Sequence, residues 1–193
     1  SGTGAVSLAG VEWEWMRRLA ADGLPCPQAV ALGEELHGGC EVRSLVLMEA
    51  VPGLSLESWA KEWADGDRTA ARALIAPLAA LIARFHALGY AHRDLYLSHI
   101  FYDPTPSPQR SLHLIDLQRV IRPRGRRLRW IIKDLASLNF STPQAVIGRT
   151  DRLRWLTQYL GRRRLDQSAR RLVYAIIGKT QRIARHDARR GRR

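Results

Sequence analysis

The chain has 193 residues, of which 46% are hydrophobic, and its 31 basic and 18 acidic residues give a formal net charge of +13. This size and apolar content favour one globular domain, and no apolar run approaches the length of a membrane span. Cys26 and Cys40 form no disulfide or metal-binding pattern, which favours a reduced, cytoplasmic setting. The positive charge predicts an anionic partner, such as a membrane surface or a phosphorylated glycolipid.

The first predicted elements are one helix and two strands. Trp13, Met16 and Leu19 recur at helical spacing, and Gly23 is a typical residue for the end of that helix. In chain order, we expect a helix over 11–22 and strands over 29–33 and 44–50, separated by a polar, glycine-rich loop over 34–43.

The rest of the chain is predicted to be mainly helical. Ser55 can cap a short helix, and Pro77 predicts a kink in a long apolar one. We expect helices over 55–63 and 69–88, a hairpin of 99–103 and 112–117 across a loop at 104–111, a basic loop over 120–129, and helices over 130–139, 151–159 and 167–184.

A short motif follows the long apolar helix. His92-Arg93-Asp94 is followed by His99, and Asp116 stands near the end of the second strand of the hairpin. Protein kinases have a catalytic loop of the form H-R-D-x-x-x-x-N, with a metal-binding Asp on the next hairpin. The chain matches this pattern except that His99 replaces Asn and no Phe-Gly follows Asp116. We interpret the motif as the catalytic loop of a protein-kinase-like phosphotransferase.

The chemistry of phosphoryl transfer explains why two carboxylates are needed. One orients the attacking hydroxyl and accepts its proton, and the other holds Mg²⁺ on the phosphates. Asp94 suits the first role, with Arg93 beside it as a second catalytic candidate, and Asp116 suits the second. His99 occupies the second metal-ligand position, but imidazole suits Mg²⁺ less well than oxygen does, so a contact with phosphate or water is the alternative. His92 is expected to be a buried structural residue.

Two further features fit a nucleotide site. A kinase fold uses a Glu on its N-lobe helix to hold the phosphate-binding Lys, and Glu12 is the candidate here, with Glu14 as the alternative. A solvated helix glutamate is an equally good explanation of Glu12. The apolar run that ends in Pro52-Gly53 is typical of the last N-lobe strand entering a hinge, or equally of a buried strand before a turn. In a hinge, an adenine would meet the backbone near Met48, Glu49 and Val51.

These motifs make the chain similar to the lipopolysaccharide kinase family, whose members phosphorylate heptose or Kdo sugars of the lipopolysaccharide core. In that family a His commonly stands where protein kinases carry Asn. The resemblance implies an α+β, protein-kinase-like fold, with ATP and Mg²⁺ as cofactors, and a structural role for Asp134 behind the catalytic loop. The shared residues are Glu12-Trp13, Gly23 to Pro27, His92 to His99, Ile115 to Arg119, Arg129-Trp130 and Lys133-Asp134-Leu135.

The chain departs from the kinase pattern before its first helix. Kinase-like folds begin with a Gly-rich strand pair and a strand that carries the phosphate-binding Lys, whereas the ten residues before Val11 contain no Lys. We therefore expect a truncated N-lobe, with a degenerate N-lobe as the alternative. Residues 1–50 would form this partial lobe, a helix plus two strands, and residues 51–193 a mainly helical C-lobe with basic C-terminal helices.

The predicted function is ATP-dependent phosphorylation of a heptose or Kdo hydroxyl in the lipopolysaccharide core. The expected partners are that core or a lipid A precursor and an anionic membrane surface, but not nucleic acid. The expected location is the cytoplasm, as a peripheral protein at the inner face of the inner membrane. Arginine forms bidentate contacts with phosphate and carboxylate, so five arginines after Asp116 are predicted to bind the acceptor: Arg122, Arg124, Arg126, Arg127 and Arg129.

Other functions compete with this prediction. A non-catalytic pseudokinase or binding module is favoured by the missing N-lobe strands and opposed by the presence of Asp94 and Asp116. A small-molecule phosphotransferase of the aminoglycoside or choline type would typically carry Gly in place of Arg93 and Asn in place of His99. Solvated charge without a partner is the alternative explanation of the five arginines.

Overall fold

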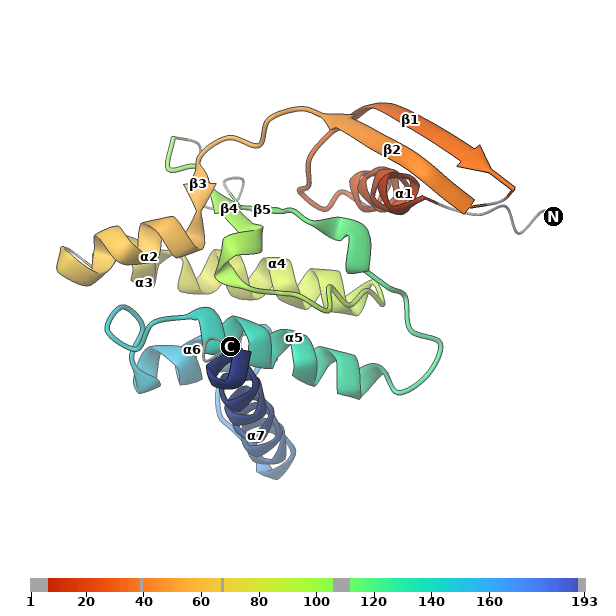
Figure 1. The fold of residues 1–193 in the computed structure, drawn as a ribbon. Helices are drawn as coiled ribbons and strands as arrows, with labels where there is room; N and C mark the ends of the chain where they lie inside the picture. The colour runs from red at the N-terminus through yellow and green to blue at the C-terminus, as the bar shows by residue number, and fades with distance from the viewer. Residues whose placement is uncertain (1–6, 39, 67, 106–111, 191–193) are drawn as a thin grey trace.

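The computed structural model describes residues 7–38, 40–66, 68–105 and 112–190. Helix α1 (Leu8–Ala21) lies under a hairpin of strands β1 (Ala29–His37) and β2 (Cys40–Met48), as Figure 1 shows. The side-chain oxygen of Ser7 caps α1 by accepting a hydrogen bond from the Gly10 N–H at 2.8 Å. Met16 and Leu19 are fully buried, so one face of this helix belongs to the core.

The hairpin is longer than the sequence predicted. Strand β1 continues to His37 and strand β2 already begins at Cys40, so both strands extend into the segment 34–43 that was expected to be a loop. Polar residues are compatible with strands here because this part of the hairpin is mostly exposed. Its polar side chains therefore remain in water and lose no hydration. Glu35 and Arg43 face each other in register, and their side chains form an ion pair with a distance of 2.5 Å between Oε2 and Nε.

A small antiparallel sheet joins the hairpin to the helices. Its strands β3 (Leu54–Ser55), β4 (Ile100–Tyr102) and β5 (Leu112–Leu114) lie in that order. Gly53 has a φ of +82°, and a Cβ at this position would lie 2.1 Å from the Tyr102 carbonyl oxygen. Only glycine therefore allows the chain to enter β3 here. Most of the predicted hairpin loop, residues 106–111, lies outside the described residues.

The long apolar helix of the prediction is two helices, α3 (Thr69–Ala73) and α4 (Ile75–Ala87). The break comes before Pro77, because proline has no N–H to donate to the residue 73 carbonyl and its ring clashes there. Contrary to expectation, the stretch Thr69–Ala87 has the length and hydropathy of a membrane span. Ile82 and Phe85 of α4 are, however, completely buried within the protein, which is the behaviour of a core helix.

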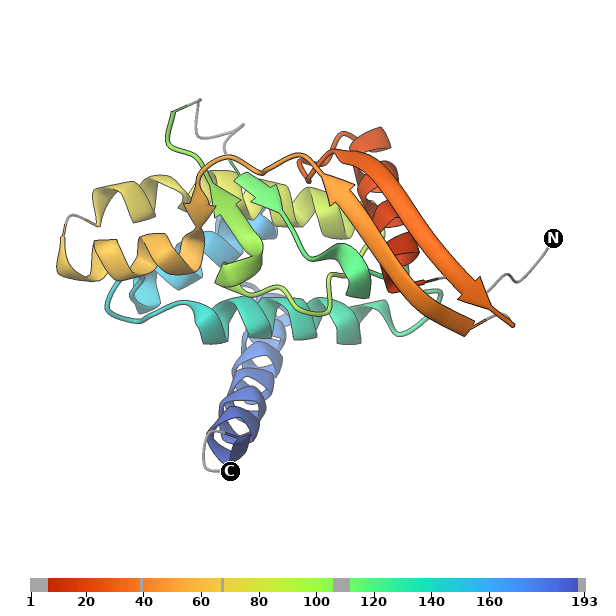
Figure 2. The same cartoon turned by 45° about the horizontal axis from the view of Figure 1, so that its top comes forward.

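The other α-helices in the described part of the chain are α2 (Leu56–Asp65), α5 (Arg127–Ser141), α6 (Arg149–Tyr159) and α7 (Gln167–Arg190). Helix α5 packs against α7, and α4 packs against α6. Helix α5 starts three residues earlier than predicted, so Arg127 and Arg129 lie on a helix and not in a loop. Helix α7 extends past Ala184, and Figure 2 shows its C-terminal end projecting from the body of the molecule.

Candidate active site

The His92-Arg93-Asp94 loop is held from behind by Asp134 of helix α5. The backbone N–H groups of His92 and Arg93 donate to the two Asp134 carboxylate oxygens, each at 2.7 Å. His86 of α4 lies 3.2 Å from the same carboxylate through Nε2. Asp134 is completely buried, and a buried carboxylate needs such partners. These contacts hold the loop at Arg93, which has a left-handed conformation with a φ of +73°.

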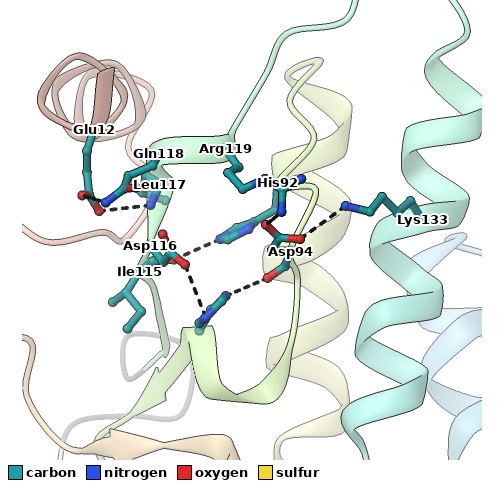
Figure 3. Close-up of polar contacts among 10 residues, drawn as sticks. Glu12, His92, Asp94, Ile115, Asp116, Leu117, Gln118, Arg119 and Lys133 are labelled. Atoms are coloured by element: carbon teal, nitrogen blue, oxygen red, sulfur yellow. Dashed lines mark hydrogen bonds and ion pairs between the residues drawn. The ribbon is translucent and has the colours of Figure 1, made fainter. Parts of the chain in front are cut away.

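The Asp94 carboxylate lies between two cationic side chains (Figure 3). Arg119 Nη1 is 2.6 Å from Asp94 Oδ2, and Lys133 Nζ is 3.3 Å from Oδ1. The Lys133 ammonium also donates to the Arg93 carbonyl. Burial lowers the pKa of Lys133, while Asp94 acts in the opposite direction. The carboxylate is therefore fixed in orientation, as a group that must meet a substrate hydroxyl should be.

His99 connects Asp94 with Asp116. Its Nδ1 lies 2.8 Å from the Asp94 carbonyl oxygen, and its Nε2 lies 3.4 Å from Asp116 Oδ2. A carbonyl only accepts, so Nδ1 must carry a proton. Asp116 has a φ of +56°, and 41% of its side chain is exposed. The structure thus brings Asp94, His99 and Asp116 together, as the motif predicted.

His92 stabilises the loop from the inside. Its Nε2 lies 3.0 Å from the carbonyl of Ile115, the residue before Asp116, so Nε2 is the protonated nitrogen. Within the part of the chain that the structure describes, Nδ1 is buried without a hydrogen-bond partner. Burial lowers the pKa of His92, and both observations agree with a neutral ring.

Glu12 contacts a different group from the one that the kinase pattern suggested. Its carboxylate accepts hydrogen bonds from the Leu117 N–H at 3.2 Å and from Gln118 Nε2 at 3.0 Å. Lys133 lies at Asp94 instead of at this glutamate. Glu12 is buried and so connects α1 to the turn that follows Asp116 (Figure 3).

The predicted hinge follows strand β2. Met48 is the last residue of β2 and packs against the core. The Glu49 N–H donates to the Gln28 carbonyl at 2.9 Å, so this donor is used within the protein. Val51 is half-buried and Glu49 is exposed.

The five predicted acceptor arginines are all exposed, but several also contact the protein. Arg127 donates to the His86 carbonyl. The guanidinium carbon of Arg122 lies 5.9 Å from the centroid of the Tyr90 ring. Arg129 and Arg93 each lie 5.2 Å from the Trp130 ring centroid. Two antiparallel bonds between Ala91 and Ile121 place the start of this segment beside the catalytic loop.

Arg119 and Lys133 are the site residues that the sequence reasoning did not select. Both touch Asp94, although they come from separate segments. Each lies close in the sequence to a residue that was predicted for the site: Lys133 directly precedes Asp134, and Arg119 is the third residue after Asp116. Neither position in the sequence shows which carboxylate the Lys133 or Arg119 side chain contacts.

A large hollow lies away from this site. It has a volume of about 780 Å³, lies among α2, α4, α5, α6 and α7, and is lined mostly by apolar side chains such as Leu78, Leu135 and Ile176. Its lining contains neither Asp94 nor Asp116. The catalytic geometry, not the size of the hollow, therefore identifies the candidate active site.

Comparison with known proteins adds relatives of assigned function. A family model described as the lipopolysaccharide kinase (Kdo/WaaP) family matches residues 6–159. The lipopolysaccharide core heptose(I) kinase WaaP of Pseudomonas aeruginosa is 32% identical over 157 residues, which are 78% of this chain and 59% of that protein. WaaP of Escherichia coli K12 is 29% identical over 189 residues, 93% of this chain and 71% of that protein. A further Escherichia coli WaaP is 34% identical and is covered to 56%.

A solved structure described as WaaP in complex with acyl carrier protein is also similar. It matches with a TM-score of 0.74 and 31% identity, over 90% of this chain and 76% of that one. This likeness confirms the α+β, protein-kinase-like fold that the sequence predicted. The chain spans less than two thirds of the length of the Pseudomonas relative.

Proposed function

Because the chain belongs to the lipopolysaccharide kinase (Kdo/WaaP) family, we propose that it transfers a phosphoryl group from ATP to a heptose or Kdo hydroxyl of the lipopolysaccharide core. The main supporting observation is the Asp94 carboxylate, fixed between Arg119 and Lys133. A carboxylate held in this way can orient a sugar hydroxyl and take its proton during attack on phosphorus. The relatives are named as heptose(I) kinases, so heptose is the favoured sugar.

Asp116 and His99 are the proposed residues for Mg²⁺. Since His99 Nδ1 carries the proton, the Nε2 lone pair of a neutral ring faces the Asp116 carboxylate at 3.4 Å. Two acceptors that face each other fit a cation between them. Among the described residues, no three ligating side chains gather, but Mg²⁺ usually binds through one or two carboxylates plus phosphate oxygens and water. When bound, Mg·ATP would supply the phosphoryl group and neutralise charge on it.

The remaining nucleotide contacts are proposed from the N-terminal part of the chain. The backbone around Met48, Glu49 and Val51 would meet the adenine. Because the Glu49 N–H already donates to the Gln28 carbonyl, the adenine would bond to other backbone groups of this segment. Glu12 would act through the turn after Asp116, which it contacts directly.

The proposed acceptor is the lipopolysaccharide core or a lipid A precursor, reached from the cytoplasmic face of the inner membrane. Its anionic groups would meet the exposed arginines of the segment that starts beside the catalytic loop: Arg122, Arg124, Arg126, Arg127 and Arg129. Acyl carrier protein is a further proposed partner, because a solved WaaP structure with 31% identity to this chain contains it.

One observation favours the alternative of a non-catalytic binding module. In an active kinase the glutamate of the N-lobe helix pairs with a nucleotide-binding Lys. Glu12, the candidate for that glutamate, is hydrogen-bonded here to Leu117 and Gln118 instead. The activity assay below separates the two functions, because a binding module would retain the lipopolysaccharide core without phosphorylating it.

The test is transfer of phosphate from Mg·ATP to unphosphorylated core lipopolysaccharide, with the modified sugar identified by mass spectrometry. We expect Asp94→Ala to lower kcat by roughly 10²- to 10⁴-fold, since it removes the base, and Asp116→Asn to abolish Mg²⁺-dependent ATP binding in calorimetry. Asp166→Asn is the control, because this exposed residue lies before α7. Turnover of the Asp94→Ala protein at the wild-type rate would contradict the assignment.

A further inference from the structure

Asp94 has one partly buried cationic neighbour, Lys133, and one more exposed one, Arg119. The Lys133 side chain is 22% exposed, and its ammonium also donates to the Arg93 carbonyl. The Arg119 side chain is 52% exposed, although its Nη1 lies 2.6 Å from Asp94 Oδ2. Lys133 therefore belongs to the support of the loop, whereas Arg119 is half in solvent on the accessible side of the same carboxylate.

The guanidinium of Arg119 has more binding capacity than its ion pair uses. An arginine carries five N–H donors in a rigid planar fork, and the contact with Asp94 involves the Nη1 end. This fork matches the spacing of phosphate oxygens and stays charged at any working pH. A group of this kind beside the proposed base can hold an anion at the point where the base works.

The turn that carries Arg119 is fixed independently of Asp94. Arg119 ends the short helical turn Leu117–Arg119, which begins directly after Asp116. Glu12 binds the other two residues of that turn, at the Leu117 N–H and at Gln118 Nε2. Helix α1 thus holds the turn from which Arg119 reaches the proposed base. Figure 3 shows Glu12 at Leu117 and Gln118, and Arg119 further along the same turn, above Asp94.

Resting on the function proposed above, we infer that Arg119 is a catalytic residue that binds the transferring phosphoryl group. In the step, the sugar oxygen forms a bond to the γ-phosphorus, and the bond from that phosphorus to the β–γ bridging oxygen breaks. ADP leaves with that electron pair, and the hydroxyl proton passes to Asp94. Arg119 contacts the equatorial oxygens of the transferring phosphoryl group while its Nη1 remains hydrogen-bonded to Asp94. The position of the phosphorus relative to the base is thereby fixed.

The physical need for such a residue is the negative charge of the phosphoryl group. This charge is spread over three equatorial oxygens in the transition state, where an arginine supplied in cis or in trans accelerates transfer by about 10³- to 10⁵-fold. Lys133 has no comparable access, because burial and the Arg93 carbonyl restrict it. Arg119 is therefore the cation that can stabilise the transition state more than the ground state.

The experiment compares Arg119→Gln and Arg119→Lys with Arg162→Gln in the full chain. Arg162 is the matched control: it is also partly exposed and paired with a single carboxylate, that of Asp166, but lies between α6 and α7. Calorimetry measures the affinity for Mg·ADP with and without aluminium fluoride, a planar mimic of the transferring group. Wild type and Arg162→Gln should bind Mg·ADP more tightly with fluoride present. Arg119→Gln should bind Mg·ADP within about threefold of wild type but lose most of the fluoride gain, because only the mimic contacts Arg119.

Turnover supplies the second readout. Arg119→Gln should lower kcat by about 10³-fold, and Arg119→Lys should recover part of the loss because it keeps the charge without the fork. A full fluoride gain in Arg119→Gln would overturn the inference, even with a low kcat, since Arg119 would then only position Asp94. If wild type itself transfers no phosphate to the core, the proposed function fails, and this role of Arg119 fails with it.

Discussion

At the scale of single residues, the site depends on which nitrogen of each histidine carries a proton. His92 donates from Nε2 to the Ile115 carbonyl and keeps a buried Nδ1, whereas His99 donates from Nδ1 to the Asp94 carbonyl. The two rings stack with centroids 6.0 Å apart. A proton on His92 would therefore be buried, without a partner on Nδ1, next to a second imidazole.

This arrangement predicts a loss of stability in mild acid. Burial lowers the pKa of His92 in the folded state, so below about pH 6.5 the unfolded chain binds a proton that the native chain does not. The free energy of unfolding should therefore fall as pH drops through this range, with a slope from this residue of at most about 1.4 kcal/mol per pH unit.

Thermal melts of wild type and His92→Gln between pH 8 and pH 5.5 check this expectation. Glutamine can donate to the Ile115 carbonyl but does not titrate, so the slope should become shallower in the variant. His113→Gln is the control, because His113 is a partly buried histidine whose pKa is also lowered by burial. Equal slopes in wild type and His92→Gln would rule His92 out as the source.

At the scale of elements, one carboxylate connects two helices and the catalytic loop. Asp134 on α5 binds the backbone of His92 and Arg93 and the ring of His86 on α4. His86 in turn lies 2.8 Å through Nδ1 from the hydroxyl of Tyr159 on α6, and burial raises the pKa of that tyrosine to about 12. The hydrogen-bonded chain therefore runs from Tyr159 on α6 through His86 and the buried Asp134 to the backbone of the catalytic loop at His92 and Arg93.

Removing this connection should cost stability as well as activity. Asp134→Ala leaves the buried N–H of His92 and the partly buried N–H of Arg93 unpaired. Each unpaired group costs about 1–3 kcal/mol, which for a chain of this size lowers Tm by roughly 5–15 °C. Asp94→Asn, which keeps the shape of a partly exposed side chain, should lose activity with a much smaller change in Tm. Calorimetric melts of the two variants provide the comparison. A Tm for Asp134→Ala that equals that of Asp94→Asn would contradict the structural role.

At the scale of the whole molecule, positive charge gathers on one face of helix α7. The residues at this face, which we call the α7 basic face, are Arg170, Arg171, Tyr174, Ile177, Arg182, Arg185 and Arg189; all are exposed. Tyr174 and Ile177 are 75% and 45% exposed. The opposite side of α7 packs on the body of the protein through residues such as Ile176. Exposed arginines with an aromatic and an aliphatic side chain among them are typical of helices that lie on anionic lipid.

We expect this face to bind anionic membranes. Each basic residue near an anionic surface contributes about 1 kcal/mol, so changing Arg170, Arg171 and Arg185 together to Gln should weaken binding to phosphatidylglycerol vesicles by about 10²-fold. The matched control changes Arg17, Arg18 and Arg43 to Gln, three exposed arginines of the N-terminal part. Vesicle sedimentation at two salt concentrations measures the effect, since screening weakens ionic contacts. Equal loss in both triple variants would point to net charge instead of α7.

The sequence by itself determined the order of the elements and the catalytic motif, because both depend on local patterns. Spacing of apolar residues predicted α1, and His92-Arg93-Asp94 with His99 and Asp116 predicted the centre of the site. Local patterns gave the wrong secondary structure where it depended on solvent exposure or on a clash with a residue one turn away. Strands β1 and β2 extend to His37 and from Cys40 into the segment predicted as a loop, where exposure lets a strand carry polar side chains. The break between α3 and α4 precedes Pro77 because the proline clashes with the residue one turn earlier.

Only the tertiary structure decided which groups surround the proposed base. Lys133 reaches Asp94 because α5 packs behind the catalytic loop. Arg119 reaches Asp94 because Glu12 of α1 holds the turn that carries Arg119. The contact from Glu12 to Leu117 spans 105 positions of the chain, a separation over which no periodicity in the sequence can specify a partner. The residue types needed for the chemistry are visible in the sequence, but their pairing follows from the packing of α1, α5 and the catalytic loop around a shared core.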